Sequence, residues 1–169
     1  MVKKSLFIAV ILWFSILAFI PKAELYYSIE KKLQAQDVKL NEKSIEEGLF
    51  SLTLKDVTVH VKGIAIANIE EIKFFSVLFY STLEIHNLQT DESLHTQVPA
   101  LMKDANFVHT ITSPLSISID ANGSFGLING EIGIKDKKIH IDFIETKDMN
   151  MLKPMLTKNK KGWFYEKSF

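Results

Sequence analysis

Five histidines are the side chains of this chain best suited to metal binding or proton transfer, so they come first. A zinc site on a helix commonly takes two histidines four residues apart. No two histidines here have that spacing, and none forms an HxH pair. Three of the five occupy polar positions of alternating segments, where a solvated histidine is ordinary. We therefore predict no metal site and no bound cofactor; the histidines are His60, His86, His95, His109 and His140.

Two pairs of adjacent carboxylates, Glu46–Glu47 and Glu70–Glu71, are the other candidates for acid–base chemistry. Successive side chains of a strand point to opposite faces, so neither pair is expected to share one substrate. The chain has no cysteine, no GxSxG motif and no Walker loop. These observations predict a protein without catalytic residues, which is not an enzyme.

The charge composition argues against a nucleic-acid partner. The chain has 20 basic and 20 acidic residues, and all the basic residues are lysines. A nucleic-acid-binding domain normally has a basic excess, and arginine supplies the bidentate fork that reads phosphates and base edges. We therefore expect no nucleic acid among the partners.

An uncharged stretch of 17 residues, Ser5–Pro21, follows Lys3 and Lys4. It is at the short limit for crossing a hydrocarbon core of about 30 Å and longer than the usual core of a signal peptide. Cleavage after Ala23 would put Pro21 and Lys22 where small neutral residues belong, so the sequence favours an uncleaved signal anchor over a cleaved signal peptide. The predicted anchor residues are Leu6, Phe7, Ile8, Val10, Ile11, Leu12, Trp13, Phe14, Ile16, Leu17, Phe19 and Ile20.

The two lysines before this stretch predict the topology, because positive flanks stay on the cytoplasmic side. We expect residues 1–22 to be a single-pass anchor of the bacterial inner membrane with a cytoplasmic N-terminus. Residues 23–169 are then a periplasmic β-rich domain.

A helix is predicted directly after the anchor. Pro21 suits the start of a helix, and Leu25, Ile29 and Leu33 recur every four residues. Such a helix either lies on the membrane or a partner protein, or covers one end of its own sheet; the sequence favours the second arrangement.

Residues 51–66 predict a bent strand and the start of a hairpin. Apolar residues 52 and 54 share one parity and residues 57, 59 and 61 the other, so a bulge or bend is expected at Lys55–Asp56. Lys62–Gly63 is expected to turn the chain. Residues 69–80 are a strand or a short helix, residues 81–88 a strand, residues 89–98 a loop, and residues 99–106 a short helix.

The second β block is predicted as a three-stranded meander. Residues 115–120 alternate, Asn122–Gly123 is a strong hairpin signal, and residues 124–135 form the next strand. A turn at 136–138 leads to a strand at 139–144. A short helix between Asp148 and Leu156 and a final strand at 163–169 complete the chain.

The predicted fold class is mainly β, an antiparallel and curved or half-open sheet, with an N-terminal transmembrane helix and a few short helices. Because such a sheet has one apolar face, that face must be covered by a second layer, a helix or a ligand. The residues expected on this apolar groove or core are Leu52, Leu54, Val57, Val59, Val61, Ile64, Ile66, Leu115, Ile117, Ile119, Ile139, Ile141 and Phe143.

The order of these segments resembles a known family. An anchor is followed by PKAELYY, a polar helix, the stretch LFSLTLKDVTVHVKGIAIANIEEIKF, a glycine-rich β block and the terminal KGWFYEKSF. This order resembles protein N of the type II secretion system, a family that in turn looks like a small relative of the AsmA-like proteins. The resemblance implies a non-enzymatic accessory or assembly factor of a type II secretion-like protein transport system, with secretion-system envelope proteins as partners.

A second function stays open beside the first. In AsmA-like proteins the apolar face is a groove, so the resemblance also implies a carrier of lipid or another hydrophobic ligand. A closed core favours the first function, and an open groove favours the second.

Overall fold

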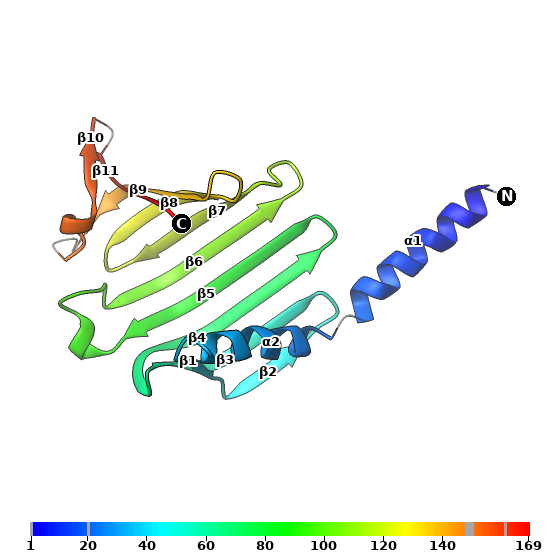
Figure 1. The fold of residues 1–169 in the computed structure, drawn as a ribbon, viewed down its shortest axis with the longest axis horizontal. Helices are drawn as coiled ribbons and strands as arrows, with labels where there is room; N and C mark the ends of the chain where they lie inside the picture. Colours follow the sequence, from blue (N-terminus) through cyan, green and yellow to red (C-terminus); the bar gives the residue numbers. More distant parts are fainter. Residues whose placement is uncertain (1, 20, 148–150, 161) are drawn as a thin grey trace.

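A computed structural model describes residues 2–19, 21–147, 151–160 and 162–169. Within these residues, eleven strands form one sheet and two α-helices precede it (Figure 1). The helices are α1 (Val2–Phe19) and α2 (Lys22–Gln34), with short 3₁₀ helices η1 (Glu92–Leu94) and η2 (Lys153–Met155). The strands are β1 (Val38–Asn41), β2 (Ser44–Glu47), β3 (Ser51–Val61), β4 (Ile64–Val77), β5 (Tyr80–Thr90), β6 (Leu101–Thr110), β7 (Ser116–Gly123), β8 (Gly126–Gly133), β9 (Lys138–Thr146), β10 (Thr157–Asn159) and β11 (Gly162–Ser168).

The sheet is antiparallel throughout its described part and open. Its order is β1-β3-β4-β5-β6-β7-β8-β9-β11-β10, and β2 also pairs with β3. Consecutive strands from β3 to β9 are neighbours, which makes this part of the sheet a meander. Its connections are short except for residues 91–100 between β5 and β6, which contain η1. This confirms the mainly β, antiparallel class, although the sheet is a single continuous one rather than two blocks separated by a helix.

Two of the predicted turns differ in outcome. Lys62 and Gly63 both have positive φ, 51° and 81°, which is the backbone of a type I′ hairpin and confirms that turn. The Asn122–Gly123 turn is displaced, because Gly123 pairs with Gly126 and the two loop residues are Ser124 and Phe125. Phe125 is buried in the core, so side-chain burial outweighs the local preference of Asn-Gly.

The predicted helix at residues 99–106 is wrong. Residues 101–106 belong to β6, which pairs with β5 and, between Met102 and Val108, also with β7. Its inward side chains include Ala105 and Phe107, and tertiary pairing decides a segment whose local propensity is ambiguous. The helix expected near Leu152 is only η2; Asp148 and Met149 lie outside the described residues.

One face of the sheet carries apolar side chains across eight strands. Directly paired residues of neighbouring strands share a face, so the registers define two parallel lines, which together we call the apolar row. The first line is Leu52, Phe74, Leu83, Phe107, Ile119, Gly130, Ile141 and Tyr165, and the second is Leu54, Ile72, Ile85, Ala105, Ala121, Ile128, Phe143 and Trp163.

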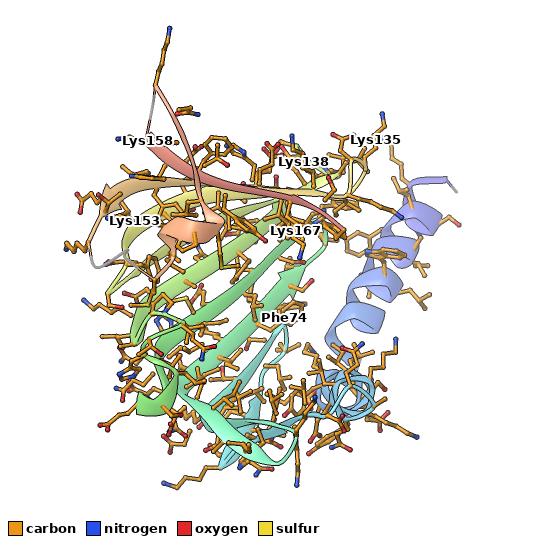
Figure 2. The ribbon with its side chains drawn as sticks, turned by 60° about the vertical axis from the view of Figure 1, so that its left-hand side comes forward. Phe74, Lys135, Lys138, Lys153, Lys158 and Lys167 are labelled. Atoms are coloured by element: carbon orange, nitrogen blue, oxygen red, sulfur yellow. The ribbon has the colours of Figure 1, made fainter. Side chains whose placement is uncertain are left out.

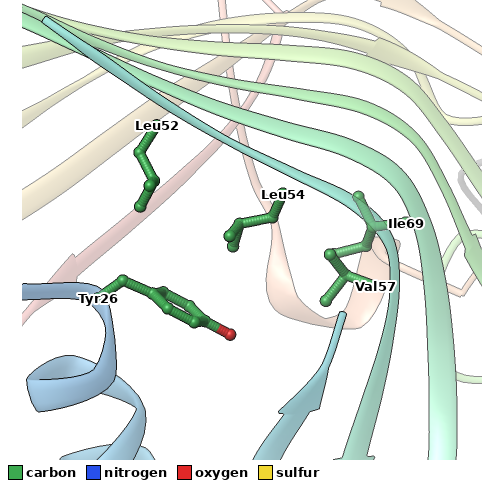
Figure 3. Close-up of a cluster of buried hydrophobic side chains, with 5 residues drawn as sticks. All are labelled: Tyr26, Leu52, Leu54, Val57 and Ile69. Atoms are coloured by element: carbon green, nitrogen blue, oxygen red, sulfur yellow. The ribbon is translucent and has the colours of Figure 1, made fainter. Parts of the chain in front are cut away.

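The sheet bends where four strands each turn two successive side chains outward. The phase change predicted at Lys55–Asp56 is confirmed, since Asp56 has a φ of 50° and Val57 is buried on the same side as Leu54. The same three-residue step between inward residues recurs at 69–72, 85–88 and 102–105. Within 85–88, Asn87 has a φ of 49°. Figure 3 shows the strands curving at this line, with Leu52, Leu54, Val57 and Ile69 facing Tyr26.

Helix α2 covers one end of the apolar face. Tyr26 packs in the buried cluster with Leu52, Leu54, Val57 and Ile69, so the helix covers its own sheet, as the sequence favours. The backbone N–H of Lys22 donates to Glu47 Oε1 at 2.8 Å, which holds the start of α2 beside the end of β2. Figure 1 shows α1 extending away from the sheet beyond this point. In the part of the chain that the structure describes, no helix combines the length and apolar character needed to cross a membrane.

Candidate functional site

A groove between α2 and the sheet is the best candidate for a binding site. It has a volume of about 490 Å³, and its walls are almost entirely apolar. Apolar cavities of this size are typical of small-molecule and cofactor sites. The lining residues are Lys22, Leu25, Tyr26 and Ile29 from α2, Leu40 from β1, Leu52 and Leu54 from β3, Ile72 and Phe74 from β4, and Leu83 from β5.

Tyr26 lines the groove between helix and sheet with its ring, while its hydroxyl is occupied by a hydrogen bond to another residue. The hydroxyl donates to Glu42 Oε2 at 2.8 Å. Burial, followed by this hydrogen bond and the nearby Glu42 charge, raises the pKa of Tyr26 far above its ordinary value. The phenol therefore stays neutral, and its ring contributes apolar surface to the groove.

The groove is open to solvent along one side. Leu25 and Ile29 are 55% and 58% exposed although they line it, and Phe74 is 39% exposed. Figure 2 shows Phe74 projecting from the sheet. Large apolar side chains that line a cavity and also meet water indicate a site that gains from an apolar occupant.

The groove continues into the rest of the apolar row. Beyond Ile72 and Leu83 the row passes to a second buried cluster of Ala105, Ala121 and Phe125. Phe107, Ile128, Phe143 and Leu152 pack against this cluster while remaining half-buried. The apolar face is thus covered at both margins and partly open between them.

The structure places most of the predicted groove or core residues on this face. Leu52, Leu54, Val57 and Ile119 are buried, with Val57 at 0% exposure. Two residues lie elsewhere: Ile64 is 69% exposed beside the Lys62–Gly63 turn, and Leu115 is 54% exposed in the loop before β7. Val59, Val61, Ile66, Ile117, Ile139, Ile141 and Phe143 are half-buried.

Several groove residues were not predicted from the sequence, because their segments were not assigned to the apolar face of the sheet. Leu40 lies on β1, a four-residue strand that was not predicted. Ile72 and Phe74 lie in the apolar segment 69–80, which the sequence leaves open between strand and helix. Leu83 shares a parity with Ile85 on the predicted strand 81–88, without a link to the other apolar strands. The signal was present, because Ile72 and Phe74 alternate in phase with Leu83 and Ile85 across the β4–β5 turn.

The outer face of the bend carries a polar depression, and it corrects the interpretation of one carboxylate pair. Glu70 and Glu71 both line it, because the bend turns both side chains outward. The expectation that they point to opposite faces is therefore wrong. Lys55, Asp56, His86, Asn87, Lys103 and Asp104 complete the depression.

Two histidines on the outer face each contact two carboxylates. His86 Nδ1 lies 2.9 Å from Asp104 Oδ1, and its Nε2 lies 3.7 Å from Glu84. The hydrogen bond with Asp104 raises the pKa of His86, against the opposing effect of desolvation. His140 Nε2 lies 3.2 Å from Asp142 Oδ2, and its Nδ1 lies 3.2 Å from Glu166 Oε2. All four contacts are partly exposed, and each is an ion pair only when the imidazole is protonated. Among the described residues, no group of three or more His, Asp or Glu side chains is arranged to hold a metal ion.

Comparison with known proteins adds no relative: no family model, no curated protein and no solved structure matches the chain.

Proposed function

We propose that this chain is a membrane-tethered protein that binds the acyl chain of a lipid, or a ligand of similar shape, in the groove between α2 and the sheet. The observation that carries the proposal is the lining of the groove, which is apolar on the helix side and on the sheet side alike. Burial of apolar surface favours such a ligand by about 25 cal/mol for each Å² removed from water. The protein acts as a carrier rather than as an enzyme.

The membrane tether is proposed from the sequence. Ser5–Pro21 contains no charged residue and follows two lysines. In this proposal the N-terminus is cytoplasmic, and the β-sheet lies in the periplasm, attached to the inner membrane. The groove then lies close to the bilayer, because α2 begins at Lys22, directly after the uncharged stretch.

The test is lipid retention by the full-length protein. Protein purified in mild detergent is extracted with organic solvent, and the lipids are measured by mass spectrometry against a detergent blank. We expect lipid in wild type and little in Phe74→Asp, because a carboxylate in an apolar site strongly disfavours an acyl chain. Phe74 is 39% exposed, so the variant is expected to remain folded.

Leu127→Asp is the matched control. Leu127 is 36% exposed and lies on the outer face, where it borders Asp120 and Asn122. This variant is expected to retain lipid like wild type. A wild-type protein that carries no lipid above the blank, or a folded Phe74→Asp variant that carries as much as wild type, contradicts the proposal.

A second proposed function is that of an accessory component of a type II secretion-like system. It is supported by the resemblance of segment order and by the open sheet, whose described part ends at β10 on one side and at β1 and β2 on the other. Backbone groups at such edges can pair with a strand of another protein. Crosslinking followed by copurification of secretion-system envelope proteins tests it, and recovery of none of them contradicts it.

A further inference from the structure

The turns at one end of the sheet expose a line of large apolar side chains. In an antiparallel meander alternate turns lie at the same end, so the turns β2–β3, β4–β5, β6–β7 and β8–β9 share one end with the C-terminus. We call this the helix-side end. Its exposed apolar residues are between 43% and 65% exposed: Leu49, Leu78, Phe79, Tyr80, Ile111, Leu115, Ile134 and Phe169.

This end is the one from which the N-terminal segment leaves. The hydrogen bond from the Lys22 backbone to Glu47 holds the start of α2 next to the β2–β3 turn. The other end of α2 lies near the β3–β4 turn, where the backbone N–H of Lys62 donates to the Asp37 carbonyl. Figure 1 accordingly shows α1 on the same side as the β2–β3, β4–β5 and β6–β7 turns.

Lysines accompany the apolar residues at this end. Lys135 and Lys137 lie in the β8–β9 turn, Lys138 begins β9, and Lys167 pairs opposite Ile139. Figure 2 shows Lys135, Lys138 and Lys167 toward α1, and Lys153 and Lys158 on the other side. Asp136 and Glu166 share the helix-side end, and Glu166 already binds Lys138 at 2.8 Å. Glu131, which lies opposite His140 as Glu166 does, and Glu47 at the β2–β3 turn also belong to this end. The basic excess is therefore local to the β8–β9 turn, where Lys135, Lys137 and Lys138 accompany Asp136.

From these observations we infer that the helix-side end docks onto the surface of an anionic lipid bilayer beside the N-terminal segment. Exposed aromatic and aliphatic turn residues insert at the level of the headgroups, where amphipathic and aromatic side chains are favoured. The lysines bind anionic headgroups, at about fivefold in the docking equilibrium for each lysine. The inference rests on the proposed membrane tether.

Docking in this orientation gives the apolar groove a route to the bilayer. Leu52, Phe74 and Leu83 lie on the line of the apolar row that is nearer the helix-side turns. These three residues also line the groove, so an acyl chain entering from the bilayer meets them first.

Single-cysteine labelling of the full-length protein tests the orientation. The chain has no cysteine, so an introduced one is the only site of labelling. Phe79→Cys and Ile134→Cys place a fluorophore at the helix-side end, and Gln97→Cys places one in the β5–β6 loop at the opposite end. The variants, checked for folding by circular dichroism, are reconstituted into vesicles of phosphatidylcholine and phosphatidylglycerol that contain a spin-labelled quenching lipid.

We expect severalfold stronger quenching at Phe79→Cys and Ile134→Cys than at Gln97→Cys, because β5 alone separates the two ends by about 33 Å. Equal quenching at both ends overturns the inference while leaving the tether intact, provided that the protein floats with the vesicles. A protein that does not float with the vesicles overturns the tether and the inference together.

Charge variants test the headgroup contact separately. Lys135→Gln combined with Lys167→Gln is expected to reduce the dependence of Phe79→Cys quenching on phosphatidylglycerol. Lys147→Gln combined with Lys160→Gln removes the same charge at the opposite end. This pair is expected to leave the dependence of Phe79→Cys quenching on phosphatidylglycerol unchanged. An equal effect of both pairs overturns the assignment of anionic headgroups to the helix-side end.

Discussion

The hydrogen bond between His86 and Asp104 on the outer face makes the stability of the protein depend on pH. The folded-state pKa of His86 is raised, chiefly by its hydrogen bond to Asp104. A group with a raised folded-state pKa adds stability that is fully present below its unfolded pKa, here about 6.5, and is lost as pH rises through the folded value.

Asp104→Asn is therefore expected to lower the pKa of His86 toward its ordinary value, as measured by NMR titration of the ring. The loss of stability relative to wild type is expected to be present below about pH 6.5 and to fade above the folded pKa. Urea unfolding at several pH values measures it. Asp120→Asn is the control, because the Asp120 carboxylate lies on the same face and accepts a hydrogen bond from Asn129. This variant is expected to leave the His86 titration unchanged. An unshifted His86 in Asp104→Asn contradicts the cause assigned here.

Tyr26 provides a second prediction at the residue scale. Tyr26→Phe removes the hydrogen bond to Glu42 and keeps the ring, so unfolding free energy is expected to fall by about 1 kcal/mol. Lipid retention is expected to be unchanged, because the groove keeps its apolar wall. Tyr27→Phe, at a neighbouring ring that is half exposed, is expected to be near neutral. Loss of lipid in folded Tyr26→Phe shows that the hydroxyl contributes to binding.

At the scale of elements, the bend across β3 to β6 requires unusual backbone at particular positions. Asp56 has a φ of 50°, which glycine adopts without strain and β-branched residues strongly disfavour. Its ion pair with Lys43 is 3.4 Å long and exposed to solvent, so it adds little to the free energy of unfolding.

Asp56→Val is accordingly expected to destabilise the protein by about 1–2 kcal/mol, whereas Asp56→Gly is expected to be near neutral. Urea unfolding of both variants measures the difference. Thr53→Val, on ordinary strand backbone of the same strand β3, controls for the introduction of valine. Equal stability of Asp56→Val and Asp56→Gly would show that the backbone at this position relaxes without cost.

The elements also show what local sequence can and cannot predict. The phase change at Lys55–Asp56 and the Lys62–Gly63 turn are readable because each depends on residues next to one another. Residues 99–106 were misread because Pro99 suits a helix start, while the pairing partners of β6 lie in β5 and β7. Register between strands, and therefore the apolar row, depends on contacts that no single segment contains.

At the scale of the whole molecule, the candidate site was half predictable. Leu52 and Leu54 follow from alternation. The shared face of Glu70 and Glu71 does not, because at the bend two successive side chains turn outward and strict alternation fails there. The groove itself was not predictable in position, since it exists only where α2 lies over β3 and β4.

The open sheet predicts unequal stability across the molecule. Central strands such as β4 and β5 are paired on both sides, whereas β10 is three exposed residues at an edge. Hydrogen exchange followed by mass spectrometry is expected to be slowest in β4–β6 and fastest in β10. Exchange in β10 as slow as in β5 would reveal that another chain covers this edge.

The apolar row has a consequence for length. It runs across the strands rather than along them, through eight strands spaced about 4.8 Å apart, and so extends over about 34 Å. The length of the apolar row therefore depends on the number of strands. Duplicating one hairpin lengthens the row by about 10 Å without altering the turns or the registers on either side. Proteins of very different reach can therefore arise from this architecture by copying a segment of some twenty residues.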